Sequence, residues 1–462
     1  MFRDLPHYAE SKPNAFWSSR TPSHWRVQPG LAVLQENRLK NDGLIEPQVL
    51  SLSYGRVVVK PVEKQRGLVP ESYEGYQILN PGDIVVRPTD LHNDQTSIRI
   101  GHVKNRGIIT SAYIGLRPFG GWSDLYAYQY LAVIDSSKRI YGMGSGLRQQ
   151  LHWSDMKRMP CLVPPAEEQT AIVKYLAHAN ARIDKAIAAK RGLISLLEEQ
   201  GRSVANAIVT RGVGDLDLAP SGLAWLGDVP IGWDVAPLKR YWSVTDCKHL
   251  TVPFTDDGIP LASVSQAQRF LLDLSDAKRT DFASYQRLIE GGRRPSAGDL
   301  IYCRNVGVGA ATVVETDEAF AMGQDVCLLR SKDQNPYFLN HFLQSDAMRA
   351  QLEMILVGST FRRVNVDDVR ALTIVVPPLV EQARLVDLID FEVAPMKLAS
   401  EKAQLEITLL REFRTRLVAD VVTGQVDVRG IAATLPDAPE PVDNAVPALD
   451  DELENFLGEG EE

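Results

Sequence analysis

The chain has 462 residues, of which 44 % are apolar, and a formal net charge of −9. No apolar run has membrane length and no N-terminal signal peptide is evident, so the composition predicts a globular, cytoplasmic protein. The overall charge does not exclude a nucleic-acid partner, because residues 430–462 carry ten acidic and no basic residues, which leaves the rest of the chain at +1.

An internal repeat organises the chain. Residues 163–213 and 376–426 share 15 of 51 residues without a gap, at an offset of 213 positions. This period is far too long for a solenoid, so it indicates two copies of a whole domain with its helix. We therefore expect five segments, namely a globular domain at 1–161, a helical segment at 162–213, a second globular domain at 214–374, a second helical segment at 375–429 and an acidic, Pro-rich, disordered tail at 430–462.

The two globular domains resemble one another weakly. Both contain short β-branched runs broken by Gly, Asp and Asn, with Gly82-Asp83 and Gly298-Asp299 in matching places. Each continues into an aromatic segment with helical character, at Tyr126–Val133 and Tyr337–Gln344. Alternating strands and a few helices predict an α+β fold of mixed α/β domains, repeated with divergent loops.

The two helical segments each begin after a Pro-Pro pair, which suits the first turn of a helix. Pro395, and Ala179-Asn180 at the matching place, predict a short helix followed by a long one. A heptad seam runs through each long segment and predicts an antiparallel intramolecular coiled coil between the copies. The apolar seam residues are Ile183, Ile187, Ile194, Leu197, Val204 and Ile208 in the first copy, and Met396, Ile407, Leu410, Leu417 and Val421 in the second.

Sequence motifs for catalysis are missing. There is no GxxxxGK[ST] phosphate loop, and the glycine-rich stretches lie outside any strand–helix dinucleotide unit. The four cysteines stand singly, without the close pairs of zinc or redox sites, and are expected to be reduced thiols. We therefore predict no catalytic, cofactor-binding or metal-binding residue in this chain.

Polar and basic residues in the loops of both domains are the candidates for binding. Arg and Lys contact phosphates, and Arg, Asn and Gln make bidentate contacts to base edges. The DNA-binding candidates are Lys60, Lys64, Arg66, Arg87, Asn93, Arg106, Arg148 and Gln149 in the first domain, and Lys278, Arg279, Arg293, Arg294, Arg304, Asn305, Arg362, Arg363 and Asn365 in the second.

The repeated PPxxEQ-led helices, the trailing Val-Thr and the Gly-Asp strands together resemble the DNA-specificity (S) subunit of a type I restriction-modification system. The resemblance covers residues 10–430 and leaves out the acidic tail. It implies two target-recognition domains, each reading one half of a bipartite DNA site. It also implies two methyltransferase (M) subunits and restriction/translocase (R) subunits as partners, with S-adenosylmethionine, ATP and Mg on those partners.

Two further properties are expected from antiparallel pairing of a head-to-tail repeat. The repeat acquires a pseudo-two-fold axis, which matches the dyad of duplex DNA. A helix of ~30 residues spans ~45 Å, or ~13 base pairs, which leaves room for two half-sites and a spacer. Because the two domains differ in sequence, the half-sites should be unlike.

Two alternatives remain open on the residues alone. The chain could be a self-contained DNA methyltransferase or nuclease with its own recognition domains, although the missing motifs oppose this. It could also be a coiled-coil scaffold whose globular domains bind protein, since such scaffolds carry the same helical seam.

Overall fold

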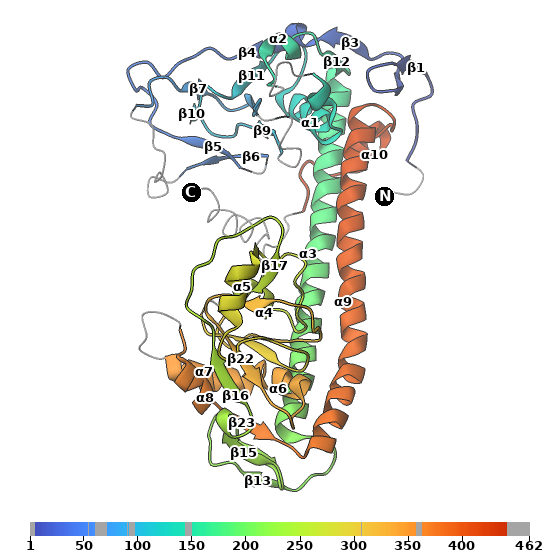
Figure 1. Ribbon diagram of the computed structural model, residues 1–462. Helices are drawn as coiled ribbons and strands as arrows, with labels where there is room; N and C mark the ends of the chain where they lie inside the picture. The colour runs from blue at the N-terminus through green and yellow to red at the C-terminus, as the bar shows by residue number, and fades with distance from the viewer. Residues whose placement is uncertain are drawn as a thin grey trace. The chain divides into compact units, whose positions relative to one another are not determined.

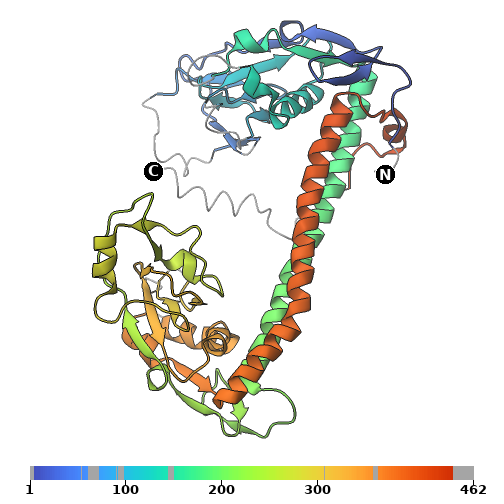
Figure 2. The same ribbon diagram turned by 45° about the vertical axis from the view of Figure 1, so that its right-hand side comes forward.

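The structure is a computed structural model that describes residues 5–53, 55–60, 72–89, 91, 98–143, 150–305, 307–356 and 363–440. The chain forms two compact units, which we call unit 1 (Met1–Arg191 with Leu405–Glu462) and unit 2 (Gly192–Gln404). Each unit combines a mixed α/β domain with one half of each of two long helices, α3 (Ala166–Arg211) and α9 (Leu379–Val422), which lie side by side in both views (Figure 1, Figure 2).

Unit 1 is built on a six-stranded sheet with the order β4-β11-β8-β9-β6-β5, accompanied by three two-stranded pairs, β1-β2, β10-β7 and β12-β3. Its elements are β1 Ser11–Asn14, β2 Ser19–Pro22, β3 Arg26–Pro29, η1 Gly30–Ala32, β4 Leu34–Glu36, β5 Leu50–Ser53, β6 Arg56–Val59, β7 Gln77–Leu79, β8 Ile84–Val86, β9 Ile100–His102, β10 Gly107–Ile109, β11 Ile114–Pro118, α1 Asp124–Ser136, η3 Arg139–Gly142, α2 Trp153–Met156, β12 Pro160–Val163 and α10 Arg429–Thr434.

Unit 2 is built on a four-stranded sheet with the order β16-β22-β19-β20 and a smaller sheet, β18-β17-β21. The pairs β13-β14 and β15-β23 complete it. Its elements are β13 Leu218–Pro220, β14 Asp228–Pro230, β15 Asp234–Pro237, η4 Leu238–Arg240, β16 Ser243–Asp246, β17 Ile259–Ala262, α4 Val264–Ala267, β18 Arg279–Thr280, α5 Phe282–Ile289, β19 Leu300–Cys303, β20 Ala311–Val313, β21 Ala321–Met322, β22 Val326–Arg330, α6 Pro336–Leu343, α7 Asp346–Leu356, α8 Val366–Ala371 and β23 Thr373–Val376.

The two domains share one core arrangement. Strands β4-β11-β8-β9 of unit 1 have the same order in space as β16-β22-β19-β20 of unit 2. The strand that leads into each long helix pairs in the same register, with Val163 opposite Arg26 in unit 1 and Val376 opposite Asp234 in unit 2. The predicted repeat of a mixed α/β domain is therefore confirmed. What differs is peripheral, namely β5 and β6 in unit 1 and the β17 sheet with α4 and α5 in unit 2.

The predicted Gly-Asp turns and aromatic helices are also present. Gly82 and Gly298 both have φ of 89°, which favours glycine, and the next residue in each turn is a buried aspartate. Arg117 donates two hydrogen bonds to Asp83, and Arg330 does the same to Asp299. The aromatic segments lie in α1 and α6.

The repeated Glu-Gln pair explains how each long helix is fixed to its domain. Gln169 accepts from the backbone N–H of Ser123 (2.8 Å), the N-cap of α1, and donates to Pro164 O (2.9 Å). Gln382 accepts from the N–H of Asn335 (2.9 Å), the N-cap of α6, and donates to Pro377 O (2.7 Å). One buried amide therefore ties the first turn of the long helix to the aromatic helix in both units.

The predicted division into a short and a long helix is wrong, because α3 and α9 each run without interruption. Pro395 lies inside α9, where it removes only the hydrogen bond to residue 391. Phe391 is 76 % exposed, so water can reach that side of the helix. Pairing with α3 then supplies the packing that keeps α9 helical across the proline.

Seam residues of both helices are buried or half-buried. In unit 1, Lys190 pairs with Glu406 (2.5 Å) and Arg414 with Asp184, so rising numbers in α3 meet falling numbers in α9. In unit 2, Gly201 faces Val393 and Met396 of α9. The antiparallel pairing is thus present within each unit, and Lys190 and Arg414 form ion pairs across the helices.

The segment predicted to be a disordered tail begins differently. Residues 429–434 form the short helix α10, so the prediction is wrong for 430–434, and Asp437 then pairs with Lys174 of α3 (3.0 Å). Residues 441–462 of the tail lie outside the described residues. None of the helices in the described ranges is long and apolar enough to cross a membrane.

Candidate nucleic-acid interface

The loops of each domain meet at one end of its main sheet. In unit 2, β16 ends at Asp246, which is opposite Cys327, and β19 ends at Cys303, which is opposite Val326 at the start of β22. Because β22 runs antiparallel to both neighbours, the loops that follow β16 and β19 lie beside the loop that precedes β22. The same argument holds in unit 1 for the ends of β4 and β8 and the start of β11.

Each of these loop ends encloses a polar hollow. The hollow in unit 2, which we call the second hollow, has a volume of about 460 Å³ and is lined by Asp246, His249, Arg304, Arg363, Asn365, Val366, Asp367 and Arg370. The hollow in unit 1, the first hollow, has a volume of about 570 Å³, and its lining includes Arg38, Lys40, Tyr113, Gln150, His152 and Trp153.

The two hollows occupy equivalent places. The backbone N–H of Leu151 donates to Pro88 O (3.0 Å) in unit 1, and that of Val364 donates to Arg304 O (2.9 Å) in unit 2. Leu151 and Val364 are 213 positions apart, the offset of the sequence repeat. The lining residues nevertheless differ in chemistry, so the shared scaffold presents two different polar surfaces.

Arginines held by carboxylates dominate the second hollow. Arg304 is buried, with Nη2 at 2.6 Å from Asp246 Oδ1. Arg363 is more exposed, at 45 % of its side chain, and its Nη2 lies 3.1 Å from Asp325 Oδ1. Arg370 bonds Asp367 and the carbonyl of Val244. The guanidinium groups of Arg363 and Arg370, which are fixed in this way and remain accessible, suit planar, bidentate recognition of phosphates or base edges.

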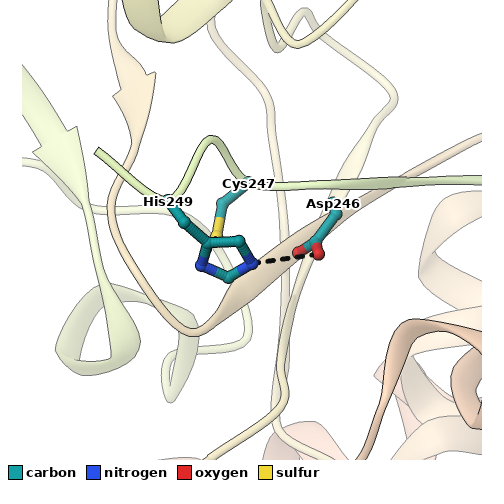
Figure 3. Close-up of side chains that lie close together, drawn as sticks. All are labelled: Asp246, Cys247 and His249. Atoms are coloured by element: carbon teal, nitrogen blue, oxygen red, sulfur yellow. Dashed lines mark hydrogen bonds and ion pairs between the residues drawn. The ribbon is translucent and has the colours of Figure 1, made fainter.

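Asp246 and His249 of the lining form a cluster with the buried Cys247 (Figure 3), with potential ligand atoms within 4.8 Å of one another. His249 Nε2 lies 3.2 Å from Asp246 Oδ2, while its Nδ1 lies 4.0 Å from Cys247 Sγ. The cation of Arg304 already neutralises Asp246, and burial raises the pKa of the Cys247 thiol. Both effects oppose binding of a divalent cation. We therefore infer that these residues hold the side chain of Arg304 in place.

The predicted DNA-binding residues are distributed unevenly over the described chain. Arg304, Arg363 and Asn365 line the second hollow, and Asn305 adjoins it through a hydrogen bond to Asp325 (3.3 Å). Lys278 lies over the ring of Phe254 (4.6 Å), and Arg279 donates to Gly258 O (2.9 Å). Both belong to the β17 sheet and its loops, so they lie apart from the residues that line the second hollow.

The remaining candidates fall into three groups. Arg293 donates to Asp246 O (2.9 Å), while Arg294 beside it is exposed. Arg106 bonds Glu46 and Asn80 at the surface of unit 1, where Lys60 and Arg87 are half-buried. The structure does not describe the last group, which consists of Lys64, Arg66, Asn93, Arg148, Gln149 and Arg362.

Several lining residues were not among the sequence candidates, namely Arg38, Lys40, Gln150, His152, His249 and Arg370. Two of them carried a usable signal, because Gln150 and His152 are the residues found by subtracting 213 from Arg363 and Asn365. The others depend on which strand ends meet in space. The four cysteines are free and buried, as expected for reduced thiols.

Comparison with solved structures first defines the class of fold. The chain is similar, with a TM-score of 0.60 and 14 % identity, to a chain in a structure of the type I R-M system solved to explain complex assembly and conformational transition. The match covers 88 % of this chain and 100 % of that one. The HsdS subunit from Thermoanaerobacter tengcongensis matches over 88 % of this chain and 99 % of its own, at 16 % identity and a TM-score of 0.42.

Sequence comparisons agree with the fold. Residues 297–403 match the family model of the type I restriction modification DNA specificity domain. The type I restriction enzyme MjaVIII specificity subunit of Methanocaldococcus jannaschii is 20 % identical over 339 residues, which cover 71 % of this chain and 76 % of that protein. The chain is thus similar in sequence and in fold to specificity subunits of type I restriction-modification systems.

Proposed function

We propose that the chain binds double-stranded DNA and recognises the two unlike halves of a bipartite site, one half with each unit. The observation that carries this proposal is the pair of equivalent hollows, which share a backbone position but differ in their side chains. Arg, Asn and Gln at such positions can form paired hydrogen bonds with base edges, and the basic residues around them can contact phosphates.

The proposed role is recognition without catalysis. Methyltransferase and restriction/translocase subunits would carry the chemistry, together with S-adenosylmethionine, ATP and Mg. A leucine that is repeated in both long helices supports a contact with a partner protein in each unit. Leu196 and Leu409 are related by the offset of 213 and are 65 % and 52 % exposed. Solvent-exposed apolar residues kept in both copies of a helix suit a protein partner, and one in each unit fits two methyltransferase subunits.

The spacer between the half-sites is the property that tests this function. The boundary between the units falls inside both helices, after Arg191 and after Gln404. We propose that these helices set the spacing between the two half-sites. Inserting three heptads at both places keeps the seam in phase and adds ~32 Å, close to one ~34 Å turn of DNA.

The expected result is a spacer longer by about one DNA turn, with both half-sites unchanged. The measurement is selection of bound duplexes from a random pool by the full chain assembled with methyltransferase subunits. A single-heptad insertion is the matched control, because it adds ~10 Å and moves the second half-site out of phase with its groove, so binding should weaken. The proposal is contradicted if the wild-type chain selects an unbroken motif, or if the three-heptad insertion leaves the spacer length unchanged.

A further inference from the structure

Arg363 and Gln150 stand at one position of the repeated fold. Each immediately precedes the residue whose backbone N–H closes the hollow, Val364 in unit 2 and Leu151 in unit 1. Both side chains are exposed and both line their hollow. Gln150 and Arg363 are therefore equivalent positions from which each hollow can contact its ligand.

Asp325 orients the guanidinium of Arg363 through an ion pair. It directly precedes β22, has φ of 62° and is one of the few non-glycine residues with a left-handed backbone in the described chain. One carboxylate oxygen lies 3.1 Å from Arg363 Nη2, and the other accepts from Asn305 Nδ2 at 3.3 Å. A strained backbone kept at a loop tip commonly serves to position side chains. Here it fixes one edge of the guanidinium and leaves further N–H donors for a ligand.

The first hollow lacks this carboxylate. Ala112 stands 213 positions before Asp325, the offset that also relates Arg117 to Arg330, and it lines the hollow together with Gln150. An uncharged amide without a carboxylate at the place of Asp325 therefore stands in unit 1 where a carboxylate-held guanidinium stands in unit 2. An amide offers one donor and one acceptor side by side, whereas a guanidinium offers donors only.

We propose that Arg363 and Gln150 are equivalent base-selecting residues, with Arg363 selecting guanine in one half-site and Gln150 selecting adenine in the other. This inference rests on the proposed function. Paired donors match the O6 and N7 acceptors of guanine, and a donor–acceptor pair matches N6 and N7 of adenine. Asp325 acts as a positioning residue, since it contacts the base only through Arg363.

The decisive experiment gives position 363 the amide that Gln150 carries in unit 1. The full chain, assembled with methyltransferase subunits, selects duplexes from a random pool as wild type, as Arg363→Gln and as Arg363→Lys. We expect Arg363→Gln to change one guanine to adenine in one half-site, and to lower the preference for guanine there by about 5-fold to 150-fold. Arg363→Lys keeps the charge but loses the fork, so the guanine preference should fall without a gain for adenine.

Two further variants separate positioning from folding. Asn tolerates a left-handed backbone, so Asp325→Asn keeps the loop while losing the ion pair, and the same base pair should become less specific. Arg349 forms an exposed ion pair with Asp346 (3.1 Å) on α7, outside the lining of the second hollow, so Arg349→Ala should leave the motif unchanged.

The outcomes distinguish this inference from the function on which it rests. A wild-type motif in two parts that Arg363→Gln leaves intact overturns the base assignment and keeps the proposed function. Loss of specificity in both half-sites, or the same change in Arg349→Ala, also overturns the assignment. A wild-type chain that selects no two-part motif overturns both.

Discussion

The first turns of α3 and α9 use the same residues in different surroundings. Glu168 is buried and meets Tyr8 (3.0 Å), His24 (2.5 Å) and Trp25 (2.9 Å). Its repeat partner Glu381 is half-buried, and among the described contacts it is hydrogen-bonded to Trp233 (3.1 Å). The tryptophan–glutamate contact belongs to the repeated fold, and the other partners are additions of unit 1.

The reason for these additions lies in the course of the chain. In unit 2, α3 continues directly through residues 212–217 into β13, so peptide bonds join the helix to its domain. In unit 1, α9 ends near a segment from the other end of the chain. There Asp427 N donates to Pro6 O (2.8 Å), and Arg429 lies over the ring of Tyr8 (5.1 Å) and 3.5 Å from Glu168. Non-covalent contacts thus join the end of α9 to its domain in unit 1, whereas the polypeptide chain itself joins the end of α3 to its domain in unit 2.

Removing the two glutamates should expose this difference most strongly. Glu168→Ala leaves several buried partners without their carboxylate and should destabilise unit 1 by about 3–5 kcal/mol. Glu381→Ala removes one half-exposed hydrogen bond and should cost unit 2 about 1 kcal/mol. Hydrogen–deuterium exchange of the full chain, measured over α1 and α6, reports each unit separately. Glu167→Ala, at an exposed neighbour, is the control, and equal losses in the two units would refute the comparison.

A half-buried histidine gives unit 2 a pH dependence that is absent at the matching position of unit 1. Burial, with a smaller effect of Lys397, lowers the pKa of His341 to about 4 from 6.5, and its ring lies 4.5 Å from that of Phe270. Because the unfolded chain binds the proton more tightly, the stability contribution is complete above pH ~6.5 and is lost as the pH falls towards 4.

The loss should reach about 3 kcal/mol at the acidic end of this range. Tyr128 occupies the matching position in unit 1, at the offset of 213. We expect His341→Phe to reduce the acid sensitivity of unit 2 and to leave that of unit 1 as it was. Urea unfolding combined with hydrogen exchange at pH 7 and pH 4.5 measures this difference. An unchanged pH dependence in the variant would show that His341 is not the group responsible.

The Gly-Asp turns should respond similarly, because the two-bond arginine–aspartate contact is the same in both units, and Arg330 adds only hydrogen bonds to Arg294 O (2.7 Å) and Ser296 Oγ (3.3 Å). Arg117→Ala and Arg330→Ala each remove a two-bond contact to a buried aspartate, which keeps a backbone N–H donor from Asn80 (2.8 Å) or Ser296 (2.9 Å). Each variant should lose about 2 kcal/mol of stability in its own unit, measured by the same exchange experiment. A large difference between the two losses would mean that the turns are not equivalent.

A structural feature could be predicted from the sequence where it depends on neighbouring or repeated residues, and not where it depends on which distant segments meet in space. The repeat, the seam and the Gly-Asp turns are local patterns, so the fold class and the antiparallel helices could be predicted. The break at Pro395 was predicted wrongly, because local propensity does not include the packing supplied by α3. The hollows required the strand order, which no local pattern contains, and only Gln150 and His152 could have been found, through the repeat offset.

The course of the chain also orders its synthesis. Unit 2 is a single continuous stretch, whereas unit 1 needs residues from both ends of the protein. As the ribosome releases the chain from its N-terminus, the last residues of unit 2 emerge before the second half of α9 that unit 1 requires. The domain translated first is thus the one completed last, and until then the face of α3 that binds Leu417 and Val421 has no intramolecular cover.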